Sequence, residues 1–202
     1  MAKLGKCLLF YLKYPSEMAR LYEADEPDVR GLSNPDQVLE KIKLVGDAGS
    51  REAAELLEKC ASGIEEHFRK ISTAERVRTN VSLRWRIQFR VAPMKTPIGK
   101  AQFTIGVTID AEDASITPWL WTWGGRRTVD EVVRILGHET KAALDGESGL
   151  VWLKEIKISL PERLDDPGDC EPLIEHVLQA FEPFTAPQIV KITALVDGRR
   201  GG

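Results

Sequence analysis

Residues 81–91 read VSLRWRIQFRV, and their strict alternation decides the fold class. The odd positions are apolar, whereas the even positions carry serine, glutamine and the arginines Arg84, Arg86 and Arg90. A period of two is the spacing of a β-strand with one buried face and one solvated face. The segment therefore predicts a strand of an antiparallel sheet with a row of positive charge on its open face.

Further segments of this kind follow at 103–110 (FTIGVTID), 116–123 (ITPWLWTW) and 150–160 (LVWLKEIKISL). Three strands in succession with no helix between them favour an antiparallel α+β sheet over a doubly wound one. Pro118 interrupts the third strand, and a proline within a strand marks an edge or a bulge. We expect a meander with one wet and one dry face.

The N-terminal third is predicted to be mainly helical. The apolar run 7–12 is too short to span a membrane and is interpreted as a buried strand. Asn34 and Pro35 begin a helix that Gly46 ends. Ser50 then begins a longer helix whose apolar residues recur every three or four positions, as on a face that packs against a core.

Three helices are predicted after the meander. Thr128 and Glu131 form a capping box for a helix that reaches about Leu144, although Gly137 weakens it. The second covers about 173–181. The third follows a capping-box pattern at 185–188, although the β-branched residues there leave a strand as the alternative.

The predicted order is β-α-α-β-β-β-α-β-α-α, with a sheet of three to five strands flanked by helices. We expect one α+β domain over residues 1–202. Its helical N-terminal third, about 1–75, would pack on the sheet formed by about 80–160, because a pair of helices alone lacks a core.

Composition restricts the function classes. The chain has 202 residues, a net charge of −3 and a pI near 5.7, whereas dedicated polyanion binders carry a large positive excess. Any basic patch must therefore be local. The cysteines Cys7, Cys60 and Cys170 form no CxxC pair, which indicates reduced thiols in a cytoplasmic protein. We see no signal peptide and no membrane span, and predict no cofactor.

The arginine row suggests a binding surface. Guanidinium groups pair bidentately with phosphate or carboxylate, so Arg84, Arg86 and Arg90 are candidate anion ligands. Arg126 and Arg127 follow Gly124-Gly125 and precede a predicted helix N-terminus, where an anion is favoured. The alternative is a solvated face, or one paired with carboxylates of the protein itself.

The tryptophans allow two interpretations. Trp119, Trp121 and Trp123 share one face of the third strand, and large aromatic side chains gain most when buried, so we expect them in the core. On an exposed face they would instead form a stacking platform or a surface for a protein partner.

Catalytic motifs are sparse. The three histidines are isolated, so no metal site is predicted. Glu155-Ile156-Lys157 resembles the E-x-K element of PD-(D/E)XK nucleases, in which two carboxylates hold a divalent metal and the lysine orients water. That resemblance implies Asp110 as partner carboxylate, with Glu65 or Glu66 as an auxiliary. The order departs from the family, because E-x-K here follows the intervening helix.

The chain ends in Arg199-Arg200-Gly201-Gly202, which looks like the tail of ubiquitin-type modifiers. The resemblance is confined to the tail, and a flexible terminus is the simpler interpretation.

Three functional hypotheses follow. The first is a non-enzymatic binding protein that engages nucleic-acid backbone or another anionic partner through Arg84, Arg86, Arg90, Arg126 and Arg127. The second is a protein-interaction adaptor without an anion site, using the tryptophan face. The third is a metal-dependent nuclease. The partner, the substrate and the oligomeric state are left open.

Overall fold

The computed structural model describes residues 3–81, 84–97, 103–123, 125–137, 141–145, 148–164 and 168–197, of which the side chains at 78–81, 84, 123, 141–145, 148 and 197 are not described. The helices are α1 Lys6–Lys13, α2 Pro15–Met18, the π-helical turn η1 Ala19–Glu23, α3 Pro35–Arg69, α4 Gly125–Leu136, α5 Glu171–Gln179 and α6 Ala186–Asp197. The strands are β1 Ser72–Val81, β2 Arg84–Pro93, β3 Phe103–Asp110, β4 Ser115–Trp123, β5 Lys141–Asp145, β6 Ser148–Trp152 and β7 Ile156–Lys157.

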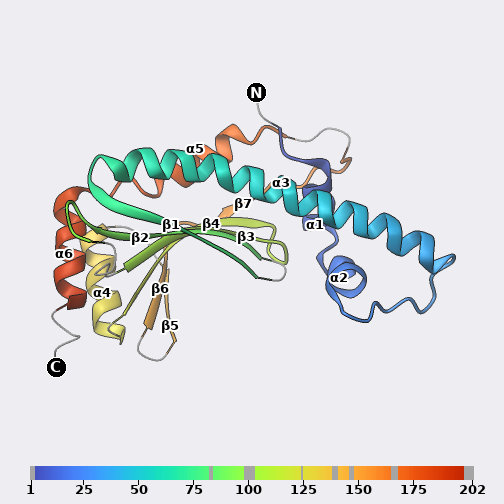
Figure 1. Cartoon of the computed structure of the whole chain (residues 1–202), viewed down its shortest axis with the longest axis horizontal. Coiled ribbons are helices and arrows are strands. Elements are labelled where there is room, and N and C mark those ends of the chain that lie inside the picture. Colours follow the sequence, from blue (N-terminus) through green and yellow to red (C-terminus); the bar gives the residue numbers. More distant parts are fainter. Residues whose placement is uncertain are drawn as a thin grey trace.

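The strands form one antiparallel sheet in the order β1-β2-β3-β4-β6-β5, and β7 pairs with β4 beyond the end of β6 (Figure 1). The α+β class and the antiparallel meander are thus confirmed. Within the described residues the sheet has seven strands, more than the three to five predicted. β1 reads STAERVRTNV, a polar sequence without clear alternation, and this is why it escaped prediction.

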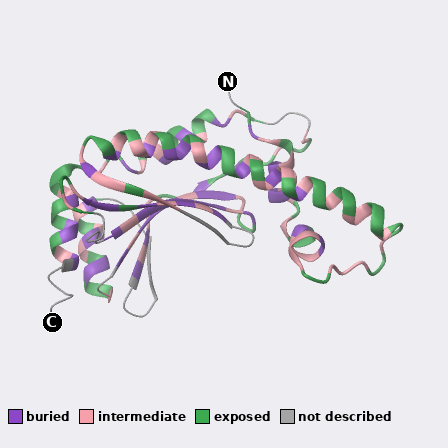
Figure 2. Ribbon diagram, in the orientation of Figure 1, coloured by how far each residue is buried: buried purple, intermediate pink, exposed green. Residues whose placement is uncertain are grey.

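Helices cover one face of this sheet. α3 crosses β1, β2 and β3, α5 contacts α3 and β4, and α6 contacts β2 and β3 (Figure 1). The odd-numbered residues of β2 and β3 point toward these helices and are buried with Ile64 and Phe68 of α3. Each such side chain contributes about 1.5 to 3 kcal/mol on leaving water. This apolar layer is the main core (Figure 2).

An aromatic cluster joins the C-terminal segment to that core. The ring centroid of Phe68 in α3 lies 6.1 Å from that of Phe181 and 5.6 Å from that of Phe184. Phe184 in turn stacks on Phe103 of β3, with ring centroids 6.5 Å apart. The backbone carbonyl of Phe184 also contacts Nε2 of His67 at 3.0 Å. His67 is therefore a structural residue. α6 is a helix, and one half of its predicted capping box is formed, since the backbone N–H of Thr185 donates to Oε1 of Gln188 at 3.1 Å.

Several predictions for individual elements were wrong. The predicted strand 150–160 is divided into β6 and β7. Residues 7–12 lie in helix α1, not in a strand, because a short apolar run does not distinguish the two. Gly46 does not end a helix, and α3 runs unbroken from Pro35 to Arg69. A Cβ at Gly46 would lie 2.5 Å from the ring of Tyr22, so this glycine lets η1 pack closely.

A further error concerns the helix after the meander. α4 begins at Gly125, so Thr128, predicted to cap it, lies inside the helix. α4 ends at Leu136, because Gly137 adopts φ +75° and its N–H closes the last turn on the carbonyl of Val133 at 3.0 Å. Residues 141–145, predicted to continue that helix, form edge strand β5.

Candidate ligand-binding cavity

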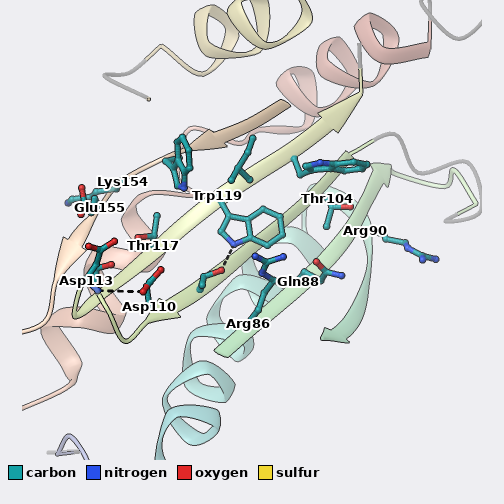
Figure 3. Close-up of a pocket in the computed structure, with 15 residues that line it drawn as sticks. Arg86, Gln88, Arg90, Thr104, Asp110, Asp113, Thr117, Trp119, Lys154 and Glu155 are labelled. Carbon is teal, nitrogen blue, oxygen red and sulfur yellow. Dashed lines mark hydrogen bonds between the residues drawn. The ribbon is translucent and has the colours of Figure 1, made fainter. Parts of the chain in front are cut away.

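The face of the sheet opposite α3 carries the even-numbered residues of β2. None of the described helices lies across it, and β5 and β6 bend away from the plane of β1, β2 and β3, so that this face is concave (Figure 1). It contains a cavity of about 760 Å³, within the range typical of small-molecule sites. The cavity is lined from β2, β3, β4 and β6 and from the turn and bulge beside them (Figure 3).

The strand register sets the order of the lining residues. One row across the sheet is Arg90, Thr104, Trp121 and Leu150. The next row is Gln88, Gly106, Trp119 and Trp152, and a third runs from Arg86 through Thr108 to Thr117. Each row therefore leads from a polar residue of β2 across β3 to β4, and the first two continue to β6.

Trp119 forms the floor of the cavity. The residue is 5% exposed, and its ring lies against Gly106, where a Cβ would stand 2.4 Å from Cζ2 of the indole. Nε1–H donates to Oγ1 of Thr108 at 2.9 Å, and the guanidinium carbon of Arg86 lies 5.2 Å from the ring centroid. Cation–π contact with a desolvated ring holds Arg86 over the floor, with its orientation restricted.

Several polar side chains of the lining make no bond to the protein. Among the described residues, Gln88, Arg90, Thr104, Thr117 and Trp152 have no hydrogen-bond or ion-pair partner for their side chains, although all five line the cavity. Polar groups at a partly enclosed surface must bond to water or to a ligand. These five side chains are thus available to a bound molecule.

Carboxylates lie at the other end of the cavity, where the β3–β4 turn meets the β6–β7 bulge (Figure 3). Oδ1 of Asp110 accepts the backbone N–H groups of Glu112 at 3.0 Å and Asp113 at 3.4 Å, which stabilises the turn. Glu155 pairs with Lys157 at 2.7 Å, and this contact raises the pKa of the lysine. The arginines of the lining thus lie toward β2 and its carboxylates toward the turn, where Lys154 stands beside Glu155 (Figure 3).

The nuclease resemblance gains little from this arrangement. Asp110 and Glu155 do line one cavity, but the described residues contain no group of three His, Cys, Asp or Glu side chains that could hold a metal. Glu65 lies 3.8 Å from Arg76 on the side of the sheet that α3 covers, and Glu66 pairs with Lys70 at 3.2 Å. Neither reaches the cavity.

The predicted arginines separate into two groups. Arg86 and Arg90 line the cavity, and Arg84 lies on the same strand, with its side chain outside the described part. Arg126 and Arg127 are exposed on α4 and are not among the lining residues; Arg126 pairs with Asp130 at 3.0 Å. The structure therefore does not place Arg126 and Arg127 beside Arg86 and Arg90.

The expectation that the tryptophan face is the core face is corrected. Ile116 and Leu120 of β4 point into the helix-covered core, whereas Trp119 and Trp121 line the cavity beside the arginines. The side chain of Trp123 lies outside the described residues. Burial of Trp119 comes from the concave surface itself, since Gly106 and Arg86 enclose its ring.

Sequence reasoning missed Leu150 and Trp152, since only strand pairing places β6 next to β4. It also left the effect of Pro118 open. The N–H of Leu153 donates to the carbonyl of Pro118 at 3.0 Å, and residues 153–155 form a bulge between β6 and β7. This bulge turns Lys154 and Glu155 toward the cavity.

A scan of protein-family models and searches of curated proteins and solved structures find no match for this chain. Within the part of the chain that the structure describes, there is no helix with the length and apolar character needed to cross a bilayer.

Proposed function

We propose that this chain is a non-enzymatic binding protein that holds a small anionic ligand in the concave cavity, with Arg86 and Arg90 as its anion ligands. The observation that carries the proposal is the placement of both arginines in one cavity beside polar groups that the protein leaves unbonded. Guanidinium groups offer paired N–H donors that match phosphate and carboxylate geometry.

Charge balance favours a small ligand over an extended polyanion. The lining contains Arg86, Arg90 and Lys154 together with the carboxylates of Asp110, Asp113 and Glu155. A nucleic-acid duplex needs a continuous basic track, because each neutralised phosphate requires its own cation. A compact ligand needs only the arginine end.

The remaining hypotheses stay predictions. Nothing in the described residues favours a protein partner over a ligand at the tryptophans, since Trp119 and Trp121 lie inside the cavity lining. A cytoplasmic location remains an expectation from the cysteines, none of which forms a disulfide in the structure.

The test is to titrate the purified chain separately with pyrophosphate, citrate and a single-stranded oligonucleotide, and to monitor binding by tryptophan fluorescence. Trp119, Trp121 and Trp152 line the cavity, so a bound ligand changes their emission. We expect saturable binding that weakens as salt screens the exposed Arg90.

The variant Arg86→Gln/Arg90→Gln should weaken binding at least about tenfold, since each charge-assisted bond contributes about 1.5 to 3 kcal/mol. The matched control is Arg126→Gln/Arg127→Gln, which removes the same charge outside the cavity. The proposal is overturned if no ligand of the three binds, or if both double variants lose affinity equally.

A further inference from the structure

We infer that the ligand of the concave cavity is a mononucleotide, a molecule in which one anionic group is joined to a planar ring and to hydroxyl or amine donors. This inference rests on the proposed function and extends it from charge to ligand class. It depends on how three kinds of side chain are ordered along the sheet.

The ring would lie on the indoles of β4 and β6. Trp121 is opposite Leu150 in the register, and Trp152 follows Leu150 by two residues, so the two tryptophans are diagonal neighbours on the same face. Both are half-buried, unlike the floor residue Trp119. Indole rings at such positions are the usual platform for a nucleobase, because every base has a π-face.

The anionic group would lie at the β2 side. Arg90, Thr104 and Trp121 occupy one row, and neighbouring strands are about 4.8 Å apart, so the row extends about 10 Å from the backbone of Arg90 to that of Trp121. Gln88 lies in the adjacent row and Arg86 in the next, both on the same strand. Arg86 and Arg90 are four residues apart on β2, with about 13 Å between their backbones. An anion at Arg90 and a ring on Trp121, which share one row, can thus belong to one molecule.

The carboxylates at the turn end of the cavity determine which groups the ligand can carry besides its ring and its anionic group. Asp113 and Glu155 can accept hydrogen bonds from hydroxyl or amino groups, and Lys154 lies beside them in the same lining. Thr117, whose hydroxyl has no partner among the described residues, lies between this end and the floor. A sugar or an exocyclic amine fits this region.

Calorimetric titration of the full chain with ribose 5-phosphate, adenosine and the four ribonucleoside 5′-monophosphates tests the inference. We expect at least one monophosphate to bind about tenfold or more tightly than ribose 5-phosphate, as base stacking predicts. Adenosine, which lacks the anion, should bind more weakly than adenosine 5′-monophosphate. Trp152→Leu should lower the affinity for the monophosphates to that for ribose 5-phosphate. The affinity for ribose 5-phosphate itself should be unchanged.

Trp85→Phe is the control, because Trp85 lies on the helix-covered face against Tyr11, with ring centroids 4.8 Å apart. If ribose 5-phosphate binds as tightly as every monophosphate, the inferred ring site is wrong while the anion site stands. If neither class binds, the proposed function fails as well. If a decanucleotide binds more tightly than the mononucleotide of the same base, the cavity binds a nucleotide of a single strand. The inference of a free mononucleotide as ligand is then wrong.

Discussion

Gly106 is the position at which the fold and the cavity depend on one missing methyl group. In Gly106→Ala, the new Cβ would stand 2.4 Å from Cζ2 of Trp119 and 2.6 Å from the carbonyl oxygen of Ile87. The backbone of β2 cannot withdraw easily, so the indole must move by about 1 Å to regain an ordinary 3.4 Å contact. That shift breaks the 2.9 Å hydrogen bond from Trp119 to Thr108.

The magnitude follows from these terms. Overpacking costs about 1 to 3 kcal/mol, and the lost hydrogen bond about 0.5 to 1.5 kcal/mol. Replacing glycine by alanine in a strand returns about 0.5 to 1 kcal/mol. We therefore expect the free energy of unfolding to fall by about 0.5 to 4 kcal/mol, and Tm by about 2 to 4 °C for each kcal/mol in a chain of this size.

Urea and thermal unfolding followed by far-UV circular dichroism measure this loss. Gly168→Ala is the matched control, because a Cβ there meets nothing within 4 Å, and its stability should be close to that of the parent. Equal or greater stability of Gly106→Ala would refute the placement of the indole across β3, and with it the support for Arg86.

Three further predictions concern single groups. Thr108→Val should cost about 1 to 3 kcal/mol in urea unfolding, because it orphans a buried indole N–H, whereas Thr104→Val, whose hydroxyl has no partner among the described residues, should be nearly neutral. The pKa of Asp28 is lowered to about 2, mainly because the side chain of Arg30 donates a hydrogen bond to its carboxylate. The contribution of this pair to folding stability is therefore complete above pH 3.8 and is lost as pH falls through about 2. Arg30→Gln should return the pKa of Asp28 toward 3.8 in an NMR titration. Burial raises the pKa of Cys60 to about 12, so iodoacetamide at pH 8 should label it only after unfolding, as mass spectrometry will reveal; rapid labelling of the folded chain would contradict its burial.

Periodicity predicted the meander well, because strands with one buried face must alternate. Residues 81–91, 103–110 and 116–123 correspond to β2, β3 and β4, although β2 begins at Arg84. The errors fall where burial is set by a neighbour and not by the local pattern. β1 is polar, yet it pairs with β2 along its length, and Arg76 on it forms an ion pair with Glu58 of α3 at 2.5 Å.

The glycines of α3 show the same limit. Gly46 and Gly49 resemble helix ends in sequence, because glycine is a poor helix former. In the structure they are contact points, where Tyr22 and the backbone of Cys7 approach the helix. Such an approach depends on which segments pack together, and the local sequence does not contain that information.

The amino-acid sequence alone determined the α+β class, the antiparallel strands and the presence of arginines on one face of β2. Tertiary structure decided which face the helices cover, and so placed Trp119 and Trp121 beside Arg86 and Arg90 and left Arg126 and Arg127 elsewhere. The physical reason is that alternation of apolar and polar residues along a strand shows only that the two faces of the sheet differ. The side that receives the helices depends on long-range pairing and on the curvature of the whole sheet.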